Sequence, residues 1–183
     1  FELKSGRGCV VFEARGGHDA TVILRSEPGS KRYEYGAGEG GGRPSSYTIK
    51  LGSHRNGWFE LERNGTTVFT TPSPPGLALT ATEFSAFWVN YADGAIAVGR
   101  NTPGRDNMVQ HWQDPHPLEN IRNVGLSTWD NHMAYRNIEV LPAVDLSAEK
   151  RPGRDERANN DETRHISPSL LQICARTVAA HLH

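Results

Sequence analysis

The sequence predicts an all-β protein: an antiparallel, jelly-roll-like β-sandwich of about ten strands, occupying residues 1–142. Two observations lead to this fold class. Short runs rich in Val, Ile, Phe, Tyr and Thr recur along these residues, separated by Gly, Asn, Asp and Pro, which is the pattern of strands and turns. The same region shows no long helical period, so a sandwich fits better than a mixed fold.

Ten runs are expected to form strands. They lie at 10–14, 21–25, 47–51, 58–62, 67–71, 87–91, 95–100, 108–112, 124–128 and 134–140. Several alternate between apolar and polar residues, as half-buried strands of antiparallel sheets do. In the last run, the alternation predicts that Ala134 and Ile138 face one side of the sheet and Tyr135 the other.

Two dipeptides predict tight hairpin turns. Asn64-Gly65 lies between the fourth and fifth runs, and Asp93-Gly94 lies between the sixth and seventh. Both accept the positive φ values that a type I′ turn requires. We therefore expect the strands on either side of each turn to pair with one another.

Composition and charge limit the partners of this chain. Twenty basic and 21 acidic residues leave a net charge of -1, which argues against a nucleic-acid-binding surface over the whole chain. No segment approaches the roughly 18 consecutive apolar residues of a membrane-spanning helix, so no membrane partner is expected. The chain does not begin with Met and is expected to be part of a longer protein, and its sequence assigns no compartment.

The two cysteines, Cys9 and Cys174, lie near opposite ends of the chain. A disulfide framework needs more cysteines, and their spacing excludes a zinc site built on a close cysteine pair. We expect both to be free thiols.

The composition changes after the predicted sandwich. Residues 143–166 are highly charged and lack aromatic side chains, so they cannot bury enough apolar surface to fold and are expected to be a disordered linker. A helical period returns at 167–183, which predicts a short amphipathic C-terminal helix. Its apolar stripe contains Leu170, Cys174 and Val178.

A glycine-rich segment at 33–42 carries the spacing of two nucleotide-binding motifs. Gly36, Gly38 and Gly41 match the dinucleotide pattern, and Glu34 with the glycines after it matches the acidic loop of adenosylmethionine-dependent methyltransferases. Either motif needs a following helix whose N-terminus holds the ligand. Here a strand follows and no βαβ unit occurs, so we expect an inter-strand loop and no cofactor.

Histidines and nucleophiles give no positive evidence for an enzyme or a metal centre. His111 and His116 flank Asp114, and His132 comes later in a turn. None has the i, i+4 spacing of a helix-borne zinc pair, and no Gly-x-Ser-x-Gly nucleophile elbow occurs. We expect exposed loop histidines, no metal and no catalytic residue.

All four tryptophans, Trp58 among them, lie on or beside predicted strands, and three can be assigned individually. Trp88 and Trp112 lie within predicted strands and are expected in the sandwich core. Trp129 lies at a strand end, in a polar loop. That loop continues with Asp130, Asn131 and His132. An aromatic ring among such side chains is typical of sugar-binding sites, so these four residues are the predicted site for carbohydrate or another small polar ligand; an ordinary polar loop is the alternative.

Several motifs together resemble the farnesoic acid O-methyltransferase (FAMeT) domain family. Residues 87–128 contain an F-W-V strand, a D-G turn, an I-A-V-G strand, a W-Q-D-P segment and a V-G-L-S-T strand. The resemblance extends over about 1–141. It implies a β-sandwich module of multidomain proteins. The family name implies methyl transfer. That activity would need a place for adenosylmethionine on a doubly wound sheet, and the sequence predicts no such sheet.

A second resemblance lies in the tail. Residues 169–178 are similar to the elongin-binding BC box of suppressor-of-cytokine-signalling and von Hippel–Lindau type proteins, with Leu170, Cys174 and Val178 at its key positions. On a helix these positions line one face, which implies a contact with elongin B/C. A terminal helix that packs on the sandwich, or belongs to a following domain, is the alternative.

The sequence thus predicts a non-catalytic recognition module that binds carbohydrate or another small polar ligand. The alternative is a substrate receptor of an elongin/cullin ubiquitin ligase, which would use the tail helix as its adaptor contact. A farnesoic acid O-methyltransferase is the third hypothesis.

Overall fold

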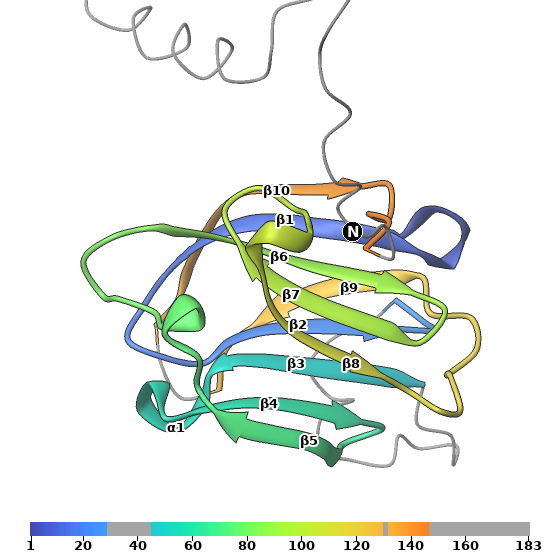
Figure 1. The fold of residues 1–183 in the computed structure, drawn as a ribbon, viewed down its shortest axis with the longest axis horizontal. Coiled ribbons are helices and arrows are strands. Elements are labelled where there is room, and N and C mark those ends of the chain that lie inside the picture. Colours follow the sequence, from blue (N-terminus) through green and yellow to red (C-terminus); the bar gives the residue numbers. More distant parts are fainter. Residues whose placement is uncertain (29–44, 130–131, 147–183) are drawn as a thin grey trace, which may run out of the picture. The chain divides into compact units, whose positions relative to one another are not determined.

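The computed structural model describes residues 1–28, 45–129 and 132–146. Its contacts divide the chain into Phe1–Ser147 and Ala148–His183, and the described residues all belong to the first unit. That unit consists of two five-stranded sheets with antiparallel pairing throughout (Figure 1). The predicted fold class is confirmed, and the ten expected strands all form.

Each sheet brings together strands distant in sequence. The first sheet has the order β10 (Ala134–Leu141), β1 (Gly8–Arg15), β6 (Ser85–Ala92), β7 (Ala95–Arg100) and β8 (Met108–Gln113). The second has the order β5 (Thr66–Pro72), β4 (Trp58–Arg63), β3 (Ser46–Gly52), β2 (Ala20–Arg25) and β9 (Asn123–Ser127). The connections contain the short helical turns η1 (Lys4–Gly6), α1 (Ser53–Asn56), η3 (Pro75–Leu77) and η4 (Arg105–Asn107).

None of the described helices is long or apolar enough to cross a membrane.

Aromatic and aliphatic side chains from the inner faces of both sheets fill the core. Phe12 of β1 lies 6.0 Å from Phe87 of β6, measured between ring centroids. Tyr47 of β3 lies 5.7 Å from Tyr91 of β6, so this pair joins the two sheets. All four are at most 3 % exposed, and each such buried side chain contributes on the order of 1.5–3 kcal/mol to folding.

Both predicted hairpins are present. Asn64 and Gly65 join β4 to β5 with φ values of 52° and 77°. Asp93 and Gly94 join β6 to β7 with φ values of 51° and 81°. These are the positive φ values that a type I′ turn requires, and they fix the register of both strand pairs.

The expected alternation along β10 is wrong. The pairing with β1 shifts register between Val11 and Glu13, and Asn137 has a φ of 51°. This β-bulge inserts one extra residue into β10 and reverses the direction of the side chains beyond it. Tyr135 therefore contacts the core, with its ring 6.0 Å from that of Phe12, and Ile138 packs against the same core.

The tryptophan predictions hold only in part. Trp112 is half-buried against the main core as expected. Trp88 is fully buried, but it belongs to a second cluster with Cys9 and Ala97, because it alternates with the core residue Phe87 along β6. Both faces of the first sheet are therefore apolar at this strand.

The segment after β10 covers this second cluster. Val144 and Leu146 pack against it, and the buried amide of Asn90 holds Val144 by two hydrogen bonds. Asn90 Oδ1 accepts from the Val144 N–H at 2.8 Å, and Nδ2 donates to the Val144 carbonyl at 3.2 Å. We name residues 143–146 the strap.

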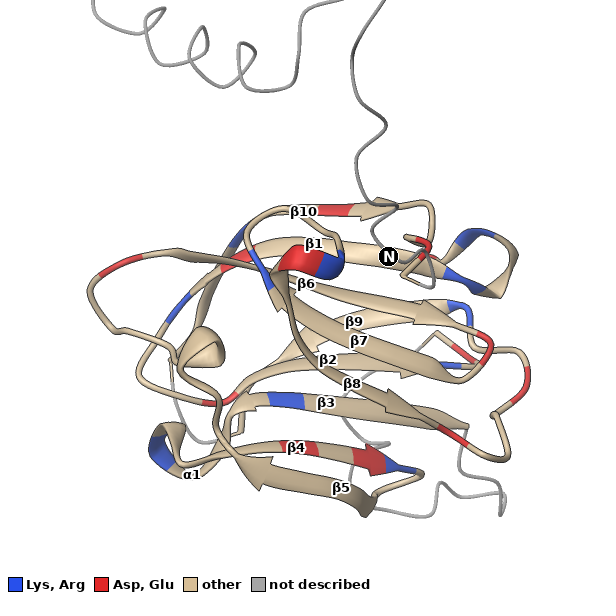
Figure 2. Cartoon of the chain, in the orientation of Figure 1, with Lys and Arg blue, Asp and Glu red and all other residues tan. Residues whose placement is uncertain are grey.

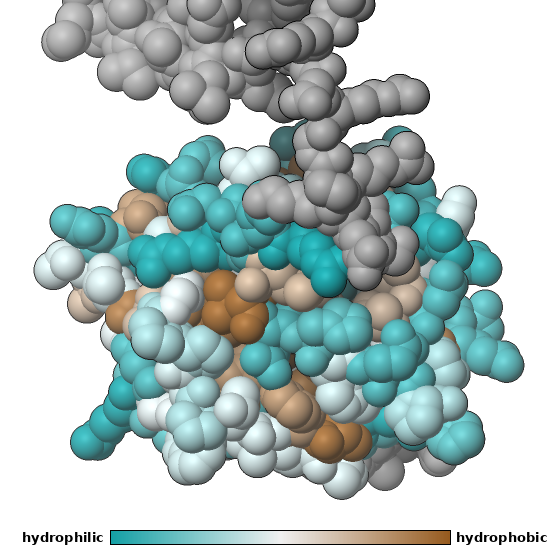
Figure 3. All heavy atoms as spheres, in the orientation of Figure 1, coloured by the Kyte–Doolittle hydropathy of each residue, from teal (hydrophilic) through white to brown (hydrophobic). Residues whose placement is uncertain are grey.

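The face shown in Figure 3 carries only small, separate hydrophobic areas. Three predicted features lie wholly or mostly outside the described residues: the glycine-rich segment 33–42, the linker from residue 147 onward, and the tail with Leu170, Cys174 and Val178.

Candidate functional site

The connection between β3 and β4 has an unusual backbone. His54, Arg55 and Asn56 have φ values of 49°, 60° and 65°. They form α1 as a single left-handed turn. An L-residue in this conformation costs roughly 1–2 kcal/mol because its Cβ crowds the following carbonyl oxygen. Strain of this kind persists only where the surroundings hold it in place, and it gathers at functional sites.

The side chain of Asn56 holds the left-handed turn. Its Nδ2 donates to the carbonyls of Gly17 at 2.7 Å and Leu79 at 3.1 Å. Its Oδ1 accepts from the N–H of Leu79 at 3.0 Å. Gly52 is needed beside it, since its φ is 66° and a Cβ there would lie 2.2 Å from Asn56 Oδ1.

This turn forms one wall of a pocket of about 440 Å³, which we name the Trp129 pocket. The pocket is lined by His18, Asp19, Lys50, Ser53, His54, Arg55, Glu60, Glu62 and Trp129. Charged residues of β3 and β4 form its floor. Figure 2 shows a basic position on β3 beside acidic positions on β4.

Four side chains of the pocket are linked by close contacts. Lys50 and Glu60 are direct cross-strand partners. Lys50 Nζ lies 2.5 Å from Glu62 Oε1 and 3.7 Å from Glu60 Oε2. His54 Nε2 approaches Glu60 Oε1 at 3.3 Å. The carboxylates and the ammonium are only 16–20 % exposed, so the floor is rich in hydrogen-bonding groups of fixed position.

Ser53 adds a buried hydroxyl to the wall. The residue is 2 % exposed, and its Oγ has no hydrogen-bond partner among the described residues. A buried polar atom without a partner costs about 1–3 kcal/mol.

Trp129 supplies an exposed aromatic surface at this pocket. Its side chain is 61 % exposed, and it follows β9. Of the other predicted site residues, His132 is exposed and does not line the pocket. Asp130 and Asn131 lie outside the described residues.

Sequence reasoning did not select Lys50, Ser53, Glu60 or Glu62. The i, i+2 spacing of Glu60 and Glu62 places both on one face of a strand and was a usable signal. The left-handed turn beside Ser53 had only a weak signal: His54 and Asn56 are residue types that tolerate positive φ, but Arg55 is not, and such residues normally occur singly.

The carboxylate of Asp114 is held in a hydrogen-bond network inside the fold. Its Oδ2 accepts from the Tyr47 hydroxyl at 2.7 Å and from Arg63 Nε at 2.8 Å, and its Oδ1 accepts from the N–H of His116 at 2.8 Å. Burial alone would raise the pKa of Asp114, but these hydrogen bonds outweigh it and hold the pKa below its usual value. His111 and His116 are exposed. Among the described residues, no group of three His, Cys, Asp or Glu side chains could hold a metal ion.

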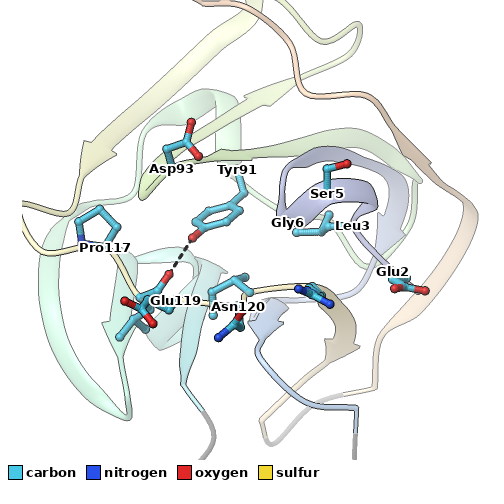
Figure 4. A pocket seen from close by; sticks show the side chains of 12 residues that line it. Glu2, Leu3, Ser5, Gly6, Tyr91, Asp93, Pro117, Glu119 and Asn120 are labelled. Atoms are coloured by element: carbon cyan, nitrogen blue, oxygen red, sulfur yellow. Dashed lines mark hydrogen bonds between the residues drawn. The ribbon is translucent and has the colours of Figure 1, made fainter.

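A second pocket, of about 710 Å³, lies beside the β6–β7 turn (Figure 4). Tyr91 contributes to its lining, and its hydroxyl donates to the carbonyl of Leu118 at 3.4 Å. The carboxylates of Glu2, Asp93 and Glu119 surround it (Figure 4). In the described residues, the buried polar side-chain atoms without a hydrogen-bond partner belong to Ser53, Ser73, Trp88 and Thr128. None of these residues lines the second pocket. The Trp129 pocket is therefore the better candidate.

Comparison with known proteins identifies the family. The family model described as Farnesoic acid 0-methyl transferase matches residues 1–141. The chain belongs to this family. The predicted FAMeT resemblance is thus confirmed over the whole sandwich.

One relative of this FAMeT domain is a BTB/POZ domain-containing protein of Arabidopsis thaliana. It is 35 % identical over 141 residues, which are 77 % of this chain and 17 % of the relative. The chain thus spans about a sixth of that protein's length.

Comparison with solved structures finds similarity to two chains. One is a prokaryotic β-1,3-1,4-glucanase (lichenase) from a mouse hindgut metagenome, with a TM-score of 0.42 and 10 % identity over 80 % of this chain and 57 % of that one. The other is a native glycosidic hydrolase, with a TM-score of 0.40 and 11 % identity over 79 % and 57 % of the two chains.

The family name raises the question of an adenosylmethionine site. Such a site needs a strand, a glycine-rich turn and a helix whose N-terminus holds the ligand. The helical turns in the described residues have only three or four residues, and every described strand pair is antiparallel. The described part of this FAMeT domain therefore does not fit that cofactor.

Proposed function

We propose that this FAMeT domain is a non-catalytic recognition module that binds carbohydrate, or another small polar ligand, in the Trp129 pocket. The observation that carries the proposal is the combination of the exposed indole of Trp129 with the fixed charged groups of Lys50, Glu60 and Glu62 in one pocket. A ligand with an apolar face and several hydroxyl groups matches both.

Each group in the pocket has a counterpart on a sugar. A pyranose ring offers a flat face of C–H groups to the indole of Trp129. Its hydroxyls both donate and accept, so they suit the carboxylate oxygens of Glu60 and Glu62 and the ammonium of Lys50.

The contacts of the carboxylates favour binding over hydrolysis. Glycosidases use two carboxyl groups on either side of the scissile bond. Here the ammonium of Lys50 contacts both Glu60 and Glu62 and occupies the space between them. The pair is thus arranged to hold polar groups.

A thermal-shift screen of the chain against neutral, amino and acidic sugars tests the proposal. Binding to the folded state alone raises the melting temperature by mass action. We expect at least one sugar to do so, and Trp129→Ala to abolish the shift. The control is Phe1→Ala, which removes an exposed aromatic side chain that does not line the pocket. A panel without any stabilising sugar would overturn carbohydrate binding.

Protein interaction through the tail is a second candidate function. The relative in Arabidopsis thaliana carries a BTB/POZ name, which favours a role in protein assemblies. In this proposal the tail residues Leu170, Cys174 and Val178 contact elongin B/C, and the sandwich selects the substrate of the ligase. A pull-down with purified elongin B/C tests it, and binding should disappear on combining Leu170→Ala with Cys174→Ala.

Methyl transfer, which the family name suggests, is a third candidate. Binding of adenosylmethionine in isothermal titration, sensitive to substitution of Gly38, would support it.

A further inference from the structure

A second exposed tryptophan lies next to the Trp129 pocket. In the described residues, the large hydrophobic side chains with high exposure are Phe1, Trp58, Val68 and Trp129. Trp58 is 42 % exposed at the start of β4. An indole left in solvent forgoes the free energy of burying a large apolar surface, and exposed aromatic rings are common at binding surfaces.

Strand geometry places Trp58 on the same face as the pocket floor. Side chains alternate along β4: Phe59 and Leu61 are buried in the core, so Trp58, Glu60 and Glu62 face the other side. Trp58 precedes Glu60 by two residues, a separation of about 6.5 Å along a strand. This is comparable with the length of one sugar unit.

Two further contacts connect Trp58 with the site. Trp58 forms an isolated antiparallel β-bridge with Ser53, a residue that lines the pocket. On its other side, Trp58 is the direct cross-strand partner of the exposed Pro72. As direct cross-strand partners, the indole and the proline ring face the same side of the sheet, at one end of the row of carboxylates.

We infer that the ligand of this site is an oligosaccharide of at least two or three units, with one ring on Trp129, hydroxyls on Glu60, and a further ring on Trp58. The inference rests on the proposed carbohydrate-binding function. It adds that the site distinguishes its ligands by the number of sugar units. Trp58 acts as a second aromatic contact that a monosaccharide cannot reach while it occupies the Trp129 pocket.

Isothermal titration with oligosaccharides of one to four units tests the inference. The probes are the glucose, galactose, mannose and N-acetylglucosamine series. We expect affinity to rise by about tenfold or more between one and three units, the gain of one aromatic contact. Trp58→Ala should remove this gain and leave monosaccharide affinity unchanged, whereas Trp58→Phe should retain part of it. Trp129→Ala should weaken binding at every length.

The outcomes separate the two proposals. Equal affinities for one and three units, or an unchanged length dependence in Trp58→Ala, would overturn the inference while carbohydrate binding stands. No binding at any length in any series would overturn the proposed function and the inference with it. The melting temperature of each variant shows whether the sandwich is folded, and Trp58→Phe supplies a test if Trp58→Ala does not fold.

Discussion

The hydroxyl of Tyr47 donates a hydrogen bond of 2.7 Å to the carboxylate of Asp114 and thereby joins the two sheets. Tyr47 lies on β3 of the second sheet, and Asp114 directly follows β8 of the first. The same hydroxyl accepts from the N–H of Leu118 at 2.9 Å, and Arg63 donates to the same carboxylate. A buried charge is tolerated here because every oxygen of the carboxylate is hydrogen-bonded.

Replacing Asp114 by Asn should destabilise the sandwich. The amide retains the size of the side chain but loses the charge that accepts from Tyr47, Arg63 and the N–H of His116. Hydrogen bonds to a charged group contribute about 1.5–3 kcal/mol, and we expect a loss of that size in the free energy of unfolding, measured by urea denaturation. A value unchanged within error would contradict the structural role of this carboxylate.

The same network predicts a dependence on pH. The pKa of Asp114 is lowered in the folded state, so its contribution to stability is present above its unfolded pKa and is lost as pH falls through the folded value. Stability should therefore decline below about pH 4, and this decline should be smaller in Asp114→Asn. Parallel pH profiles of the two proteins would show that other carboxylates account for the decline.

Removing the Asn56 side chain should disrupt the left-handed turn. Asn56→Ala loses three hydrogen bonds and leaves the N–H of Leu79 without its partner, which should cost about 2–4 kcal/mol in the free energy of unfolding. The matched control is Asn101→Ala, which also has a positive φ, 62°, in an exposed turn. It should cost only about 1 kcal/mol, the backbone strain alone. Equal losses in both variants would show that the hydrogen bonds add nothing.

Ser53→Ala should separate stability from binding. Removing a buried hydroxyl that lacks a partner relieves its desolvation cost, so the melting temperature should stay the same or rise. Affinity for the sugar ligand should stay the same, because the buried Oγ of Ser53 is not accessible from the pocket. A clear fall in melting temperature would show instead that the hydroxyl has a structural partner in the native protein.

Asn90→Ala should release the strap and expose Cys9. Burial raises the pKa of the Cys9 thiol to about 12, so the wild-type thiol should react slowly with iodoacetamide at pH 8. Without its two hydrogen bonds to Asn90, Val144 should open more often, and alkylation of the Cys9 peptide, followed by mass spectrometry, should accelerate at least about tenfold.

Asn107→Ala is the control for that experiment. Its amide also donates to a backbone carbonyl, that of Thr102 at 2.9 Å, but Asn107 belongs to η4 and makes no hydrogen bond to the strap. Its alkylation rate should match the wild type. Equal rates in all three proteins would mean that the strap does not protect Cys9.

The strands and hairpins could be predicted because their signals are local. Period-two alternation located all ten strands, and Asn64-Gly65 and Asp93-Gly94 supplied the φ values of both turns. Trp129 could be selected as a candidate because an aromatic residue within a polar loop can be recognised from the local sequence alone.

The remaining features depend on contacts between distant segments. The bulge at Asn137 follows from pairing with β1, and no sequence pattern around Asn137 predicts it. Trp88 faces the second cluster because the strap covers that side of β6. The left-handed turn exists because Asn56 reaches Gly17 and Leu79, which lie 39 and 23 residues away along the chain. Neither a hydrophobic period nor a turn dipeptide in the sequence predicts such contacts.

Isothermal titration of the wild type and Trp129→Ala with the best sugar of the screen tests the central claim most directly. Trp129→Ala should bind at least about tenfold more weakly, with an unchanged melting temperature because the side chain is 61 % exposed. Equal affinity in the two proteins would contradict the account, since the ligand would then bind elsewhere on the sandwich.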